Sequence, residues 1–338
     1  MAEPNSSPSG LSILKRWSAA LRGCNVPDIE HADSVSRWLV ISQSCVLSMT
    51  LTSALIGILV ALQGGPIHWG YALLSAAGLL IAHASNNMLN DWTDSRRGVD
   101  TENSPRVQYS VHPLIGGLTT EKRLFGAALL LLAFDAATMV ILTAGRGWPV
   151  LAFALSGLVL SLSYTGFLKR FALGELASLV VWGPLMIGGT AYVASGHWDL
   201  TYILQALPYG LIVASVLVGK HIDKIEADRT AGLRSLPVLL GEQGSRVLTK
   251  ALFVLFYGLT AALVVTRVIG PGVLLSFLAL FRLVRTWKRF SAPRPALPPE
   301  GWPVWPLWYV GWAMYFNRLA GGLYILGLAL NLVLSLLI

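Results

Sequence analysis

Hydrophobic residues occupy 54% of the 338 positions, whereas Asp, Glu, Lys and Arg together make up only 12%. Soluble domains carry about 25% charged residues, so this composition excludes an ordinary soluble globule and predicts an integral membrane protein. The net charge of +8 would suit a nucleic-acid partner, but no soluble stretch gathers the Lys and Arg residues into a basic face. Nucleic acid is therefore excluded as a partner, and the lipid bilayer is expected.

The first 37 residues are predicted to form a cytoplasmic N-terminal segment. Within it, residues 11–23 mix apolar positions with Lys15, Arg16 and Arg22 at helical spacing, which predicts a helix lying in the membrane interface. Cys24 and Cys45 stand one before and one within the first apolar stretch, and they show no disulfide framework and no metal-ligand spacing. We therefore expect neither a disulfide nor a cysteine-bound metal.

Apolar stretches dominate the rest of the chain, and each is long enough to cross about 30 Å of hydrocarbon. They predict an all-α membrane protein with nine transmembrane helices that form a single domain over residues 38–338. The expected spans are 38–62, 70–90, 123–145, 148–166, 173–195, 201–220, 246–266, 269–286 and 319–338.

The distribution of cations predicts the orientation of these helices. A cytoplasmic N-terminus places 23 of the 25 Lys and Arg residues on one side and leaves only Arg146 and Arg267 outside. This is a strong positive-inside pattern. We expect a multi-pass protein of a bacterial or archaeal type of plasma membrane, with its C-terminus outside and with the loops 91–122 and 220–245 in the cytoplasm.

A first polar cluster stands at the foot of the second apolar stretch. Asn87, Asp91 and Asp94 are three or four residues apart and project from one face of a helix, with Asn90 beside them. Oxygen ligands without Cys or His suit Mg2+, which commonly sits between carboxylates and a phosphate-bearing substrate. The alternative interpretation is a polar cap on a helix end.

A second acidic cluster, at residues 221–229, follows another long apolar stretch. Asp223 and Glu226 share one helix face, and Lys224 and Asp228 share another. The two clusters occupy matching places in a weak internal repeat, since Asp91 and Asp223 are 132 residues apart, about one four-helix unit. Repeats of this kind place shared sites at their interface, so the clusters are expected to face each other across one cavity.

Basic residues lie close to both clusters, among them Arg96, Lys169 and Lys224. Acids interleaved with Lys and Arg favour a polyanion held through metal bridges, and a diphosphate with an isoprenoid tail among the helices fits that description. Mg2+ and the cations would stabilise the leaving diphosphate. Aromatic faces such as Tyr164, Trp182 or Tyr192 would shield an allylic cation, unless they serve packing alone.

Four further residues allow a functional or a plain structural interpretation. In the loop after the first cluster, His112 can take a proton near neutral pH, and Arg106 can bind an acceptor carboxylate bidentately. Glu175 begins the fifth predicted helix, where the helix dipole alone favours an acid. His221 lies within the second cluster, where it either serves the site or faces lipid headgroups.

These residues also resemble a known family. The pattern Asn87-x-x-Asn90-Asp91-x-x-Asp94 is similar to the first aspartate-rich motif of the UbiA superfamily of intramembrane prenyltransferases, and it is closest to the menaquinone-pathway branch that prenylates dihydroxynaphthoate. The resemblance extends over roughly residues 38–285. Its further blocks are 164–175, 182–190 and 225–236.

The resemblance implies nine helices around a central cavity, with Mg2+ bridging the diphosphate to both motifs. Asn87, Asp91 and Asp94 match the first-motif ligands of metal and diphosphate, Lys169 matches a diphosphate-binding basic residue, and Asp228 matches the last acid of the second motif. The usual Asn-x-x-Arg-Asp is replaced here by residues 220–224, Lys-His-Ile-Asp-Lys. Either Asp223 replaces the missing carboxylate, or Lys224 neutralises phosphate directly.

The sequence thus predicts a Mg2+-dependent prenyltransferase that joins a polyprenyl diphosphate to an aromatic acceptor of the dihydroxynaphthoate type. Another acceptor, such as hydroxybenzoate, a chlorophyllide, haem or a carotenoid, is the first alternative, and a cation-coupled transporter is the second. The expected metal ligands are Asn87, Asp91, Asp94, Asp223 and Asp228. The expected catalytic residues are Asp91, Asp94, Asp223, Asp228 and Lys169. The expected substrate-binding residues are Asn87, Asn90, Arg96, Arg106, His112, Lys224 and Tyr164.

Overall fold

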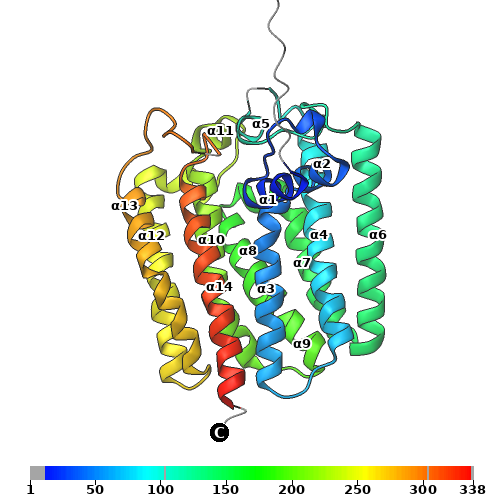
Figure 1. The fold of residues 1–338 in the computed structure, drawn as a ribbon, viewed down its shortest axis with the longest axis vertical. Helices are drawn as coiled ribbons and strands as arrows, with labels where there is room; N and C mark the ends of the chain where they lie inside the picture. The colour runs from blue at the N-terminus through cyan, green and yellow to red at the C-terminus, as the bar shows by residue number, and fades with distance from the viewer. Residues whose placement is uncertain (1–11, 103, 303, 336–338) are drawn as a thin grey trace, which may run out of the picture.

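The computed structural model describes residues 12–102, 104–302 and 304–335, apart from the side chains of residues 165, 166 and 169. These residues form helices and connecting loops without a β-strand. The long helices stand side by side, and several short helices cover one end of the bundle (Figure 1). The covered end holds α1 (Ile13–Gly23), η1 (Ile29–His31), α2 (Ser34–Ile41), α5 (Pro105–Tyr109) and α11 (Ile225–Thr230).

Seven helical segments of the described residues are long and apolar enough to cross a membrane. Together they make the chain a multi-pass integral membrane protein. They are α3 (Ser44–Gln63), α4 (Trp69–Arg96), α6 (Glu121–Arg146), the run Gly174–Ser195, α10 (Leu200–Ile222), α12 (Leu236–Val265) and α14 (Tyr309–Ser335). The run Gly174–Ser195 joins α8 (Gly174–Val180), a π-helical segment η3 (Val181–Gly188) and α9 (Gly189–Ser195).

The expected count of nine spans is therefore not confirmed by length and composition. The fourth expected span forms α7 (Trp148–Gly166), which is followed by the short η2 (Leu168–Arg170). The eighth begins with the 3-10 helix η4 (Pro271–Ala279) and continues as α13 (Leu280–Phe290), which carries four Lys and Arg residues. The two segments η4 and α13 have 9 and 11 residues, so together they extend about 34 Å along the helix axis.

The bundle is organised around α10, which packs against α8, η3, α12 and α14. Its neighbours fill the core with fully buried aromatic rings, including Phe253, Phe256 and Phe316. At the covered end, a Cβ atom on Gly219 would lie 3.0 Å from the backbone of Tyr309. Glycine at this position lets the end of α10 approach the start of α14, next to the second acidic motif.

The first predicted span is broken near its start. Gln43 has a φ of 53°, and this left-handed residue separates α2 from α3. Cys24 and Cys45 form a disulfide that ties the loop after α1 to the first turn of α3. The expectation of no disulfide is therefore wrong. The 21-residue separation carried no signal because the N-terminal segment must fold back before the two thiols meet.

Candidate active site

The first motif lies on the last three turns of α4, which remains helical through Arg96. Its amides Asn87 and Asn90, together with Asn86, line a cavity of about 1020 Å³. The wall of this cavity runs from these polar groups into the apolar interior between the helices. Further lining residues include Val46, Leu79, Leu132, Leu158, Tyr164, Trp182 and Lys220.

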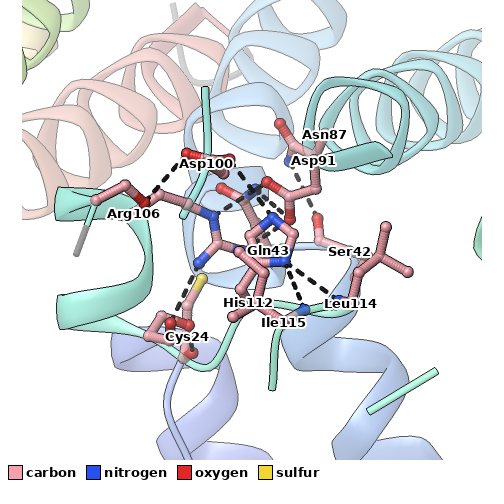
Figure 2. Close-up of polar contacts among 12 residues, drawn as sticks. Cys24, Ser42, Gln43, Asn87, Asp91, Asp100, Arg106, His112, Leu114 and Ile115 are labelled. Atoms are coloured by element: carbon pink, nitrogen blue, oxygen red, sulfur yellow. Dashed lines mark hydrogen bonds and ion pairs between the residues drawn. The ribbon is translucent and has the colours of Figure 1, made fainter. Parts of the chain in front are cut away.

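Asp91 lies behind this wall, with 3% of its surface exposed. Arg106 clamps the carboxylate bidentately, its Nε donating to Oδ1 at 3.1 Å and its Nη2 to Oδ2 at 2.7 Å (Figure 2). The Nε2 amide of Gln43 donates to both oxygens, at 3.1 and 3.2 Å. The left-handed turn before α3 thus brings Gln43 to the motif. Arg106, expected to bind an acceptor carboxylate, here neutralises Asp91.

Asn87 is oriented by a hydrogen bond from its Nδ2 to the carbonyl of Ser42, at 3.0 Å. Its amide nitrogen is therefore engaged at the α2–α3 break, and its amide oxygen is the hard donor that Asn87 can offer a cation. Asp94 is half-buried, and its backbone carbonyl accepts from the amides of Val99 and Asp100. These bonds fold the chain back immediately after α4.

His112 is fully buried in the loop that follows α4. Its Nδ1 accepts from the amides of Leu114 and Ile115 at 3.2 and 3.3 Å, so the proton of the neutral ring resides on Nε2. This Nε2 lies 3.4 Å from Oδ2 of Asp100. Burial opposes ionisation of Asp100, but the hydrogen bond from His112 and the charge of Arg106 outweigh it, so the pKa of the carboxyl falls below its usual value.

Donor atoms of Asp91, Asp100 and His112 all lie within 4.8 Å of one another. The loop therefore gathers two carboxylates and an imidazole around the base of the motif (Figure 2). His112 was expected to contact the acceptor, whereas in this structure it holds the loop together.

The second motif begins where α10 ends. Asp223 accepts hydrogen bonds from the amides of Tyr309 and Val310, both at 3.0 Å, one on each carboxylate oxygen. It therefore caps the N-terminus of α14. Asp228, with 2% of its surface exposed, accepts from Ser235 Oγ at 3.2 Å.

Lys220 lines the cavity together with the amides of the first motif, and it directly precedes the second motif in the chain. The ammonium group of this cavity-lining residue interacts electrostatically with Asp91 and Arg106 from the first motif and its loop, and with Asp228 and Lys224 from the second motif. The charge of Lys224 also acts on Asp100. Charges of both clusters thus act on one lysine, whereas no described residue of the second cluster is among those that line the cavity.

Several predicted site residues lie elsewhere or outside the description. Arg96 pairs with Glu121 at 3.2 Å on the surface, where both side chains are more than half exposed. Lys169 belongs to η2, and its side chain lies outside the described residues. Of the three candidate aromatic residues, Tyr164 and Trp182 line the cavity, whereas the hydroxyl of Tyr192 donates to the Arg146 carbonyl.

Four polar residues of the site were not predicted from the sequence. His83 and Asn86 line the cavity and stand seven and four residues before Asn90, so helical spacing alone could have found them. Lys220 opens the second motif but carried no assigned role. Gln43 gave no sequence signal, because its role depends on the break between α2 and α3.

Comparison with known proteins assigns the family. The pattern of the UbiA prenyltransferase family matches residues 50–302. A 1,4-dihydroxy-2-naphthoate octaprenyltransferase from Mycobacterium tuberculosis is 31% identical over 225 residues, covering 60% of this chain and 74% of the relative. The protein of the same name from Bacillus subtilis is 25% identical over 214 residues, covering 61% and 66%.

The fold agrees with this assignment. The solved structure of a UbiA homolog from Archaeoglobus fulgidus bound to DMAPP and Mg2+ superposes with a TM-score of 0.58 and 16% sequence identity. The match covers 85% of this chain and 99% of that one. Because the family pattern covers most of the sequence and the fold is shared, the chain belongs to the UbiA prenyltransferase family.

Proposed function

We propose that this protein transfers a polyprenyl group from its diphosphate to a dihydroxynaphthoate-type aromatic acceptor in a Mg2+-dependent reaction. The observation that carries the proposal is the cavity of about 1020 Å³, polar at the first motif and at Lys220 and apolar between the helices. A diphosphate with a long hydrocarbon tail has the same division into a charged head and an apolar chain. The acceptor class is supported by the names of the two relatives.

The diphosphate would be held at the polar end of the cavity. Lys220 and the amide of Asn90 face the cavity there, and Lys224 adds positive charge from the second motif. Charge-assisted hydrogen bonds from such groups bind phosphate oxygens strongly and stabilise a leaving diphosphate. Lys169 joins this group on the strength of the family resemblance.

The residues at this end of the cavity fit Mg2+. The ion prefers oxygen donors, and the buried carboxylate of Asp91 already recruits a cationic partner in Arg106. Asn87, Asp91, Asp94 and Asp228 would hold the ion, which supplies positive charge to the departing diphosphate when bound. Asp223 is omitted from this set because its oxygens accept from backbone amides that are fixed in α14, whereas the partners of Asp91 are side chains that can turn aside.

Prenyl transfer also requires a dry chamber for an electrophilic allylic carbon. The apolar lining would exclude water from it, and the aromatic faces of Tyr164 and Trp182 at the cavity wall would stabilise positive charge on the prenyl group. The chamber would lie on the cytoplasmic side of a bacterial or archaeal type of plasma membrane, with the C-terminus outside, because the cation distribution favours that orientation.

The experiment is a transfer assay with purified protein in lipid nanodiscs. Octaprenyl diphosphate and 1,4-dihydroxy-2-naphthoate are supplied with Mg2+ or with EDTA, and products are identified by mass spectrometry. Prenylated naphthoate that forms only with Mg2+ supports the proposal. Hydroxybenzoate, a chlorophyllide, haem and a carotenoid precursor are tested in parallel. A product from one of these acceptors and none from naphthoate would replace the acceptor and retain the reaction class.

A further inference from the structure

Three side chains form a string of hydrogen bonds from the cavity wall into the bundle. The hydroxyl of Tyr164, on α7, lies 3.2 Å from Nε2 of His221, at the end of α10. The Nδ1 of His221 lies 2.5 Å from Oε1 of Glu175, in the first turn of α8. Tyr164 lines the cavity, and the other two residues lie behind it.

The burial of this string fixes the roles of its members. Glu175 and His221 are each 2% exposed, and Oε1 of Glu175 also accepts from the amide of Leu236 at 3.2 Å. A buried carboxylate beside Nδ1 holds the imidazole proton on that nitrogen, so Nε2 is the acceptor for the Tyr164 hydroxyl. This is the order of groups in a Ser-His-Asp triad, with a phenol in the place of the serine.

No other histidine at the described site is arranged in this way. His112 accepts two amide hydrogen bonds at Nδ1 and points Nε2 at Asp100, away from the cavity lining. His83 lines the cavity, but its Nδ1 is bonded to the hydroxyl of Thr50 and not to a carboxylate. In the Tyr164 string, by contrast, Tyr164 lines the cavity and the imidazole of His221 is hydrogen-bonded to the carboxylate of Glu175.

We propose that Tyr164 is the proton-transfer residue for the aromatic acceptor, with His221 and Glu175 as positioning residues that receive and hold the proton. The inference rests on the proposed function. As the acceptor ring carbon bonds to the prenyl carbon, the carbon–oxygen bond to diphosphate breaks and its electron pair leaves with the diphosphate. An acceptor hydroxyl gives its proton to the Tyr164 oxygen while Tyr164 gives its own proton to His221 Nε2.

This step balances without an oxidant or a further reactant. The electron pair of the acceptor O–H bond forms a ring carbonyl, and the resulting imidazolium is stabilised by the adjacent Glu175 carboxylate. The charged groups that act on Tyr164 are Glu175 on α8 and Asp228 on α11, and Lys220 on α10 lines the same cavity. Asp228 is close enough for its charge to act on Tyr164, so the two acids favour the transient cation.

The test measures kcat and KM against pH for transfer to 1,4-dihydroxy-2-naphthoate. Tyr164→Phe removes the hydroxyl and keeps the ring, and it is expected to lower kcat about a hundredfold, within the usual range for general acid–base groups, with little change in the KM for diphosphate. His221→Gln and Glu175→Gln are expected to lower kcat and remove the acid limb of the pH profile. Tyr202→Phe is the matched control, because Tyr202 pairs with His197 at 2.9 Å outside the cavity lining.

Retained Mg2+-dependent binding of geranyl diphosphate checks that each variant is folded. Wild-type kcat in Tyr164→Phe would overturn this inference and leave the proposed function intact. Unchanged pH profiles in both His221→Gln and Glu175→Gln would have the same consequence. A wild-type protein that transfers no prenyl group to any acceptor would overturn the proposed function and this inference together. A loss of kcat in Tyr164→Phe with an altered pH profile in the other two variants supports it.

Discussion

The contact between Asp91 and Arg106 explains how the first motif is stable before a metal or a substrate arrives. Asp91 is nearly inaccessible, and removing an unpaired carboxylate from water costs several kcal/mol. A bidentate guanidinium compensates that cost and leaves the amides of Asn87 and Asn90 facing the cavity. A metal bound to Asp91 would therefore compete with Arg106 for the same oxygens.

Arg106→Gln is expected to destabilise the protein by about 3 kcal/mol, because the buried charge of Asp91 loses its main partner. The same variant should gain more thermal stability from Mg2+ than the wild type does, since the competing cation is gone. Thermal unfolding in detergent with and without Mg2+ measures both effects. Arg96→Gln is the control, because its exposed pair with Glu121 is worth less than about 1 kcal/mol. Equal Mg2+ shifts in all three proteins would contradict the competition.

Helical spacing in the sequence predicted one face with Asn87, Asp91 and Asp94 and with Asn90 beside it, whereas only the two amides line the cavity. Helical spacing could not predict the partners of Asp91. A break between two helices brings Gln43 to this carboxylate, and the path of a loop brings Arg106 to it. Asp223 illustrates the same limit. Its spacing suggested a metal ligand, whereas its surroundings are set by α14, which begins 86 residues later in the chain.

At the scale of elements, Asp223 connects the second motif to the last helix. Asp223→Ala is expected to lower the free energy of unfolding by about 1 kcal/mol, the usual cost of removing an N-cap. Most of the transfer activity should remain, since α14 loses a cap and the cavity lining is unchanged. Urea unfolding and the transfer assay measure the two properties. If Asp223→Ala lost transfer activity as completely as Asp91→Asn does, Asp223 would have to be assigned as a metal ligand.

The loop after α4 is a second element whose order depends on one contact. The pKa of Asp100 is lowered in the folded protein, so ionised Asp100 contributes stability above its unfolded value of about 3.8, and this contribution is lost as the pH falls through the folded pKa. The wild type should therefore unfold at a higher temperature than Asp100→Asn at pH 6, and the difference should shrink at pH 3. A difference that grows on acidification would contradict the role of the His112 contact.

Most predicted helices coincide with observed ones, since continuous apolar stretches in a bilayer leave the backbone no other way to satisfy its hydrogen bonds. The exceptions have local causes. Gln43 ends α2 in a left-handed conformation, Pro184 lies within the π-helical segment of the fifth span, and Gly241 kinks α12 with a φ of 69°. Gln43 and Pro184 lie within apolar stretches that the prediction used, whereas Gly241 lies in the loop expected at 220–245, so the start of α12 was not predicted.

At the scale of the molecule, both motifs lie at the end of the bundle covered by short helices, and α14 ends at the opposite side (Figure 1). In a background with Cys24 and Cys45 replaced by serine, Val99→Cys and Trp198→Cys place thiols on exposed positions of the two ends. A membrane-impermeant maleimide applied to intact cells is expected to label Trp198→Cys and not Val99→Cys. The reverse pattern would contradict a cytoplasmic site.

Two motifs far apart in the chain are proposed to serve one diphosphate, and ligand binding measures whether both contribute. Titration calorimetry compares geranyl diphosphate binding, with Mg2+ present, in the wild type, Asp91→Asn, Asp228→Asn and the control Asp199→Asn, whose side chain caps α10 outside the cavity lining. Losing even a group that only orients a metal ligand typically costs about 10–100-fold in metal affinity, so a variant that loses a proposed ligand itself should bind at least about tenfold more weakly. The control should bind like the wild type. Wild-type affinity in Asp228→Asn, alongside a loss in Asp91→Asn, would contradict a shared site.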